Sequence, residues 1–432
     1  MYHPSTRHIL GFLLALAVIF GGSTMLYAER ASRYAAHLQT VYQSGFSQLM
    51  GHISAMDTAL EKTQYASSAA RQMLAADIWR ESSSAAALLS ALPVNAEASD
   101  ALGGYLSQTA DYARFLLRSE PYGTDGAEKW DTLSAMQRNS RNMLDALEPL
   151  KERLDAGDIL FPDPVISGDG QFASSLATLN EDLSARPTLE YDGACSDHLA
   201  ERTALAFEGE KPFQQEDCAE SVKKVLGEKA RSLGDSQGQI PAYLFSDGDR
   251  TALFSKAGGR LLSFHDPRET GPAKLSDDDA IHSATDFVKS LGLTSMQVGD
   301  LTKSNGVCTV TMSDSANGVT AYGDSVRVGV ALDDGAVVHF DASDYAMNHH
   351  TREAQAPAIA SEDAKSLLPA SLSLESERTV YRQSEGKNDV LCWEYVCNGG
   401  EAGSVVYYIN CENGQIEAID LLSETENGIL RR

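Results

Sequence analysis

The strongest constraint on the fold of this chain is a turn that recurs three times in its C-terminal half. Each copy places a glycine between two alternating apolar stretches, and the glycines are Gly259, Gly335 and Gly414, spaced 76 and 79 residues apart. The second and third copies are Asp-Gly and Asn-Gly pairs, which favour β-hairpins because such turns need a residue with positive φ. A period of this length indicates a structural unit repeated in tandem.

A polar, acidic segment typical of a helix start precedes each of these turns. Ser276 and Ser361 are predicted N-caps, because a serine oxygen can accept a hydrogen bond from a free N–H of the first turn. The carboxylates that follow them suit the positive end of the helix dipole. We therefore predict three tandem units, each a helix lying on a small antiparallel sheet, with the first the most degenerate, over residues 205–268, 272–346 and 357–422.

The segment before these repeats has a helical pattern. Apolar residues there alternate in spacing between four and three positions, which predicts helices that pack along their length. Proline and glycine clusters divide the segment into stretches short enough to fold back on one another as an antiparallel bundle. We predict such a bundle over residues 29–185, with one seam formed by Tyr42, Phe46, Leu49, Ile53, Met56 and Leu60.

The first 28 residues predict a short cytoplasmic stub followed by a membrane anchor. Residues 9–27 contain no charged side chain, and a helix of that length spans about 28 Å, close to the ~30 Å thickness of the hydrocarbon core. We therefore expect one uncleaved transmembrane helix, with the bulk of the chain on the extracytoplasmic side. A cleaved signal peptide is the alternative, but Leu26 stands where the cleavage site would need a small residue.

Composition and motifs argue against several functions. The chain has 35 Lys and Arg against 61 Asp and Glu, a net charge of −26, which argues against a nucleic-acid binder because phosphates need a basic face. The H-E-x-x-H, Walker A and G-x-G-x-x-G motifs do not occur. We therefore predict that the chain is not an enzyme, and we assign no catalytic residue, cofactor or metal ligand.

Two groups of side chains have reactive or metal-binding chemistry, but simpler interpretations account for both. The six cysteines are too sparse for a disulfide-built fold, so buried thiols or a disulfide remain open. His349 and His350 stand in a polar stretch after the second repeat, where we expect a solvated linker. A metal-binding or pH-sensing role is the alternative for this histidine pair.

The second repeat carries a family resemblance. Residues 326–345 read VRVGVALDDGAVVHFDASDY and closely resemble the corresponding stretch of the YpeB family of spore-germination proteins, in which a helix and a β-meander form each PepSY module. The anchor, the helical region, the tetrapeptide at residues 77–80 and the order of the repeats fit this family along essentially the whole chain. The resemblance implies an α+β fold with a membrane helix, a helical bundle and three PepSY-like units.

The same resemblance implies a function without catalysis. Proteins of this kind are expected in the spore inner membrane, where a spore cortex-lytic enzyme of the SleB type needs them for its stability and localisation during sporulation and germination. Cortex peptidoglycan stays open as a further partner. The alternative function is an ectodomain that itself binds or cleaves peptidoglycan. A third option, a PepSY prodomain that inhibits a protease, ranks last because no protease domain is attached.

Overall fold

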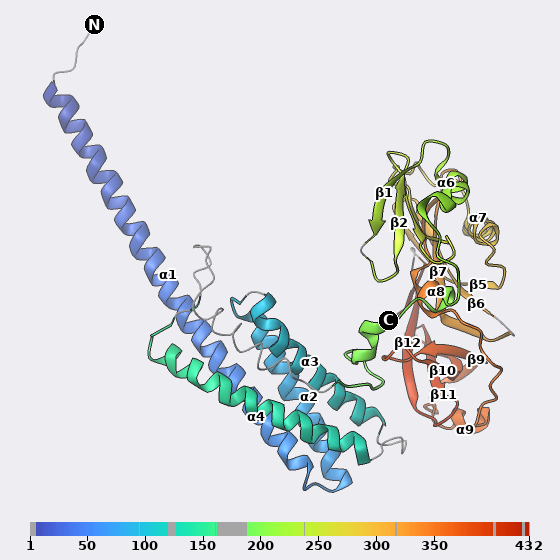
Figure 1. Ribbon diagram of the computed structural model, residues 1–432, viewed down its shortest axis with the longest axis horizontal. Helices are drawn as coiled ribbons and strands as arrows, with labels where there is room; N and C mark the ends of the chain where they lie inside the picture. The colour runs from blue at the N-terminus through green and yellow to red at the C-terminus, as the bar shows by residue number, and fades with distance from the viewer. Residues whose placement is uncertain are drawn as a thin grey trace. The chain divides into compact units, whose positions relative to one another are not determined.

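A computed structural model describes the protein at residues 6–94, 96–119, 127–159, 161, 188–236, 238–315, 318–400, 403–425 and 428–431. The chain divides into two compact units, which comprise residues Met1–Tyr191 and Asp192–Arg432. Helices make up the first unit and a large sheet dominates the second (Figure 1). This agrees with the mixed helix and sheet composition that the sequence predicts.

The first unit is a helical bundle. Helix α1 packs against both α2 and α4, and α2 packs against α3. The helices are α1 (Thr6–Thr63), α2 (Ser68–Ala91), α3 (Ala96–Ser119) and α4 (Ala127–Asp155). The bundle prediction is therefore correct up to Asp155, whereas most of its expected final part, residues 162–185, lies outside the described residues.

The predicted seam lies in the core of this bundle. Phe46, Leu49, Ile53, Met56 and Leu60 on α1 are each at most 1% exposed, and Tyr42 packs partly buried against the same cluster. Buried leucines from the other three helices complete the cluster. Burial of large apolar side chains contributes about 1.5–3 kcal/mol each, so this seam contributes to the stability of the bundle together with the rest of the cluster.

The expected membrane anchor lies within α1. Residues 9–26 are helical, but their side chains fall outside the described part of the structure. Within the part that is described, no helix contains a segment long and apolar enough to cross a membrane.

The second unit contains three successive helix and strand groups, with a further strand at the end. Short 3-10 helices at Asp197–Glu201, Leu205–Phe207 and Gln215–Cys218 precede the first group. The groups are α6 (Ala219–Leu226), β1 (Arg231–Ser236), β2 (Ala242–Ser246), β3 (Thr251–Ser255) and β4 (Leu261–His265); α7 (Asp277–Ser290), β5 (Met296–Ser304), β6 (Val307–Asp314), β7 (Thr320–Ala331), β8 (Val337–Asp341) and α8 (Ser343–Asn348); and α9 (Ser361–Lys365), β9 (Ser373–Gln383), β10 (Asp389–Asn398), β11 (Ser404–Asn410), β12 (Ile416–Thr425) and β13 (Gly428–Arg431).

The prediction of three small separate sheets is wrong. All thirteen strands in the described residues belong to one sheet, in the order β1-β2-β3-β4-β8-β7-β6-β5-β13-β12-β11-β10-β9. The first repeat joins the second where β4 pairs with β8 in antiparallel fashion, and the third joins where β13 pairs with β5. Unpaired strand edges carry free N–H and C=O groups, so pairing the repeats with one another satisfies groups that separate sheets would expose.

Part of this sheet closes on itself. Strands β7, β6, β5, β13, β12, β11, β10 and β9 follow one another, and β9 then pairs with β7 in parallel through Thr320↔Val380 and Ala321↔Tyr381. We call these eight strands the strand ring. Helix α7 covers the outside of the second repeat and α9 that of the third. The two helix-free faces therefore line the inside of the strand ring.

Candidate functional site

The three turn glycines occupy equivalent places in the repeats. Gly259, Gly335 and Gly414 have φ values of 60°, 80° and 79°, the left-handed region that favours glycine. A Cβ atom at each would meet an apolar side chain that precedes the helix of the same repeat. These side chains are those of Phe213, Leu275 and Ile359, respectively. Each turn thus packs against the start of its own helix and holds the helix on the sheet.

The two predicted caps differ from one another. Ser276 is the N-cap of α7, where its hydroxyl accepts a hydrogen bond from Asp279 N–H at 3.2 Å and Asp279 bonds back to complete a capping box. The prediction for Ser361 is wrong, because Ala360 is the N-cap of α9 and Ser361 is its first helical residue. The Ser361 hydroxyl instead lies 3.2 Å from the hydroxyl of Tyr395 on β10.

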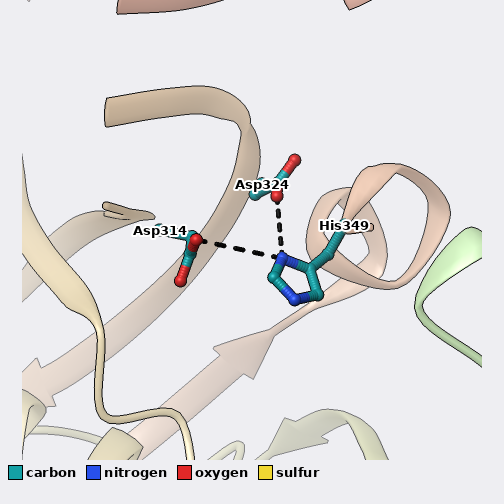
Figure 2. A group of neighbouring side chains, drawn as sticks. All are labelled: Asp314, Asp324 and His349. Atoms are coloured by element: carbon teal, nitrogen blue, oxygen red, sulfur yellow. Dashed lines mark hydrogen bonds and ion pairs between the residues drawn. The ribbon is translucent and has the colours of Figure 1, made fainter. Parts of the chain in front are cut away.

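One group of side chains has metal-ligand chemistry and close spacing. Asp314 at the end of β6, Asp324 on β7 and His349 after α8 bring their ligand atoms within 4.8 Å of one another. Figure 2 shows both carboxylates facing Nδ1 of the His349 ring, which lies 2.8 Å from Asp324 Oδ2 and 4.0 Å from Asp314 Oδ2.

The contacts of Arg352 indicate whether this group is a metal site or an ion-pair cluster. Its guanidinium donates to both oxygens of Asp324, at 2.6 and 2.7 Å, and its Nε donates to Asp389 at 2.6 Å. Asp324 is fully buried, which by itself would raise the pKa of its carboxyl, but the hydrogen bonds from His349 and Arg352 outweigh burial and hold that pKa below its ordinary value. An added cation would compete with Arg352 for the same carboxylate, so the group fits an ion-pair cluster better than a metal centre.

This cluster corrects the expectation of a solvated histidine linker. The His349 ring stacks on Tyr345 at 4.4 Å between centroids, and Nε2 of His350 lies 3.5 Å from Asp389 at the start of β10. The stretch after α8 therefore ties the second repeat to the third. Sequence reasoning missed it because Asp324 and Asp389 stand 25 to 40 positions away and follow no motif.

The inside of the strand ring holds a second polar network. Arg431 on β13 donates to Asp300 at 3.0 Å, to Asp420 at 3.0 Å and to the Tyr408 hydroxyl at 2.8 Å. These bonds connect β5, β11, β12 and β13 across the inside of the ring. The Arg431 side chain is only partly buried, and these partners offset the cost of taking its charge partly out of water.

A neighbouring group on β7, β9 and β10 has the same character. Arg378 donates to Glu394 at 2.6 Å and to the Tyr322 hydroxyl at 2.8 Å, and that hydroxyl donates to Glu394 at 2.5 Å. Burial, and then the nearby Glu394 carboxylate, raise the pKa of Tyr322 to about 12. The phenol therefore stays protonated and serves as a donor at neutral pH.

A cavity of about 370 Å³ lies beside these two networks, within the strand ring. Its size falls in the usual range of small-molecule sites, about 300–1,000 Å³. No motif in the sequence indicates it, since its lining comes from strands β5, β6, β7, β9, β11, β12 and β13.

The sheet also leaves strand edges open. Among the described strands, β1 pairs only with β2, and β9 reaches β7 only at Val380 and Tyr381. Leu233 stands at a bulge in β1 and is 62% exposed. These edges are the surfaces of the sheet on which another chain could add a strand.

The cysteines are free thiols rather than disulfides in this structure. Cys195 is exposed and the other five are buried. Burial raises the pKa of Cys411 to about 11, so its reactive thiolate is scarce at neutral pH. Five of the six thiols thus serve as small apolar side chains in the core.

Comparison with known proteins agrees with this architecture. Bundle and sheet together define a PepSY-repeat protein with a helical N-terminal region. A family profile described as "YpeB N-terminal" matches residues 30–163, and one described as "YpeB sporulation, PepSY1 and PepSY2 domains" matches residues 172–355. The chain belongs to the YpeB family of sporulation proteins.

Individual relatives match over nearly their whole length. Sporulation protein YpeB of Halalkalibacterium halodurans is 23% identical, with 97% of this chain and 98% of the relative covered. YpeB of Bacillus subtilis is also 23% identical, with the same shares covered. Among solved structures, the Bacillus megaterium YpeB C-terminal domain is similar at 22% identity and a TM-score of 0.45, covering 49% of this chain and 99% of that domain.

Proposed function

We propose that this sporulation protein is a non-enzymatic partner, anchored in the spore inner membrane through residues 9–27, that stabilises and localises a cortex-lytic hydrolase of the SleB type. Its family membership supports the role in sporulation. In the proposed arrangement the bundle and the repeats lie on the extracytoplasmic side, where such a hydrolase would act.

The geometric observation that carries the proposal is the open edge of β1. Its bulged, exposed Leu233 adds an apolar contact beside unpaired backbone groups. The open part of β9 carries Glu375 and Glu377, and charged side chains commonly protect an edge from pairing. In β1 the charged residues, Arg231 and Asp235, leave the exposed Leu233 between them. A strand of the hydrolase added to β1 would gain main-chain hydrogen bonds together with a side-chain contact.

Stabilisation follows from such binding by mass action. A partner that binds the folded hydrolase in preference to its unfolded chain lowers the fraction open to proteolysis. Attachment to a membrane raises the effective concentration of the captured enzyme there, so a modest affinity suffices.

The test is co-purification of the full chain, in detergent, with the hydrolase in the presence of EDTA, followed by a protease time course on the hydrolase. We expect capture and slower digestion. Leu233→Asp should abolish both effects, whereas Leu374→Asp, an exposed leucine at the open part of β9, should leave them unchanged. Digestion of the hydrolase at one rate with and without this protein would reject direct protection.

Zymography in a gel that contains cortex peptidoglycan tests the alternative function, an ectodomain that cleaves peptidoglycan. The purified protein alone should produce no clearing in the gel. Clearing without added hydrolase would instead favour an ectodomain that cleaves peptidoglycan itself.

A further inference from the structure

The cavity of the strand ring has a mostly polar lining with two aromatic rings in it. The residues of β5 and β6 that line it are Gln297, Asp300, Thr311 and Ser313, with Val298 and Gly299. Tyr322 and Tyr408 contribute the rings. Such a lining suits a small molecule that has many polar groups and a ring or methyl face that can lie against an aromatic ring.

Arg382 is the charged group with unused donors in this cavity. In the described part of the chain its guanidinium makes a single hydrogen bond, to Asp420 at 3.3 Å, although arginine has five N–H donors. The guanidinium carbon lies over the Tyr408 ring, 4.3 Å from its centroid, and the side chain is 30% exposed. A planar guanidinium that solvent reaches is the group that binds a carboxylate through two parallel hydrogen bonds.

The other charged groups of the cavity are already paired. Arg431 is held by Asp300 and Asp420, and Arg378 by Glu394. Three arginines therefore face three carboxylates, so the site has no net charge, and the spare donors of Arg382 are the cationic groups that a ligand meets. A monoanion fits this balance, whereas a dianion such as phosphate would be repelled by Asp300 and Asp420.

Neutral polar groups line the wall of β6. Cys308, Val310 and Met312 belong to the core under α7, so the alternation of the strand turns Thr311 and Ser313 to the inside of the ring. Within the described residues, neither hydroxyl makes a hydrogen bond to the protein. Hydroxyl and amide groups of a ligand are the natural partners for these side chains.

We propose that the cavity of the strand ring binds a small monocarboxylate that carries hydroxyl or amide groups, the chemistry of an acidic amino sugar. Arg382 takes the carboxylate, and Thr311 with Ser313 takes the hydroxyl or amide groups. The rings of Tyr322 and Tyr408 contact the carbon skeleton. This binding is separate from the capture of a hydrolase and holds whether or not that partnership exists.

The experiment uses the full chain in detergent and three probes in saturation-transfer NMR and calorimetry. N-acetylmuramic acid and N-acetylglucosamine share a sugar ring and an acetamido group, but only the first has a carboxylate. Inorganic phosphate is the third probe. We expect N-acetylmuramic acid to bind, N-acetylglucosamine to bind at least about tenfold more weakly, and phosphate not to compete.

Variants locate the binding. Arg382→Gln should weaken binding of N-acetylmuramic acid at least about tenfold, and Thr311→Val about two- to tenfold. Arg327→Gln is the matched control, because Arg327 forms a similar ion pair with Asp341 and Asp344 and does not line the cavity. It should bind like the wild type. Thermal unfolding of each variant verifies that it folds, and Thr311→Val retains the test if Arg382→Gln does not fold.

Three results would overturn the proposal. The first is no binding of N-acetylmuramic acid at millimolar concentration. The second is equal binding of both sugars, or competition by phosphate, since either removes the selectivity for a sugar monocarboxylate. The third is unchanged binding by Arg382→Gln and Thr311→Val, which would place the ligand elsewhere.

Discussion

The bundle and the strand ring bury their interiors by different means. The bundle core is a regular series of apolar side chains on α1, each a few positions from the next. The ring interior contains ion pairs between residues far apart in the chain, such as Arg431 and Asp300, which are 131 positions apart. An apolar core tolerates approximate packing, whereas a buried charge depends on one particular partner. The bundle also contains a buried carboxylate, Asp57, which pairs with Arg141 of α4, but its seam residues are all apolar or aromatic. The sheet unit should therefore be more sensitive than this seam to the loss of a single charged side chain.

Loss of Arg352 should be the largest effect. Arg352→Ala leaves the fully buried Asp324 with only His349, and removing one partner of a buried pair costs about 3–5 kcal/mol. Hydrogen exchange should show loss of protection in the second unit and none in the bundle. Arg327→Ala, at an exposed ion pair, is the control and should change little. Equal protection in both variants would contradict a structural role for the Arg352 cluster.

A cavity created by mutation in the bundle core should have the second-largest effect on stability. Ile53→Ala removes a fully buried side chain from the seam and should cost about 2–5 kcal/mol, confined to the first unit. Val41→Ala on the same helix is the control, since Val41 is 48% exposed. Thermal unfolding combined with hydrogen exchange measures both. Matching losses of protection in the sheet would show that the units do not unfold separately.

A mutation that opens the strand ring should have the third-largest effect on stability. Gly428 has a φ of 109° at the β13–β5 junction, and a Cβ there would lie 2.1 Å from the carbonyl oxygen of Leu301. Gly428→Val combines backbone strain of about 1–3 kcal/mol with this clash, so β13 should separate from β5 while β1–β4 stay protected. Gly400→Val is the control, because Gly400 also has positive φ but open space around its Cβ position. Similar exchange of β5 in the two variants would speak against a closed ring.

The turn of the second repeat should give a smaller effect. At Gly335 a valine is strained by the φ of 80° and its Cβ lies 3.2 Å from Leu275, so Gly335→Val should destabilise the sheet unit by about 1–3 kcal/mol. Ala336→Val places the same residue at the next, exposed position and should be nearly neutral. The melting temperatures of the two variants test this prediction, and equal values would show that valine causes no strain at this turn.

Low pH should produce the smallest difference in stability between the two units. The pKa of Asp324 is lowered in the folded protein by His349 and Arg352 against the effect of burial, so its contribution to stability is present above its ordinary pKa and is lost as pH falls through the folded value. Below about pH 4 the sheet unit should therefore lose stability, and Asp324→Asn should lose less over the same range. Melting curves from pH 7 to pH 2 measure this, and identical pH slopes for both proteins would assign the acid sensitivity to other carboxylates.

Much of the first unit could be predicted because its signal is local. The seam residues from Phe46 to Leu60 share one helix face, so their spacing alone indicates what is buried. The cap at Ser276 and the turns at Gly335 and Gly414 are local in the same sense, since each depends on a few neighbouring residues. Ser361 shows the limit of such reasoning, because its side chain bonds to a strand 34 positions away instead of capping its helix.

By itself, then, the sequence determined the helices of the bundle, the repeated units and their turns, and the family. Only the tertiary structure decided that the repeats share one sheet, that β4 pairs with β8 and β9 with β7, and that arginines and carboxylates meet inside a ring. A hairpin turn pairs strands that are adjacent in the chain. The pairing of distant edges and distant charges depends on which backbone and charged groups remain unsatisfied once the units have formed. Such pairing produces no periodic pattern in the sequence from which it could be predicted.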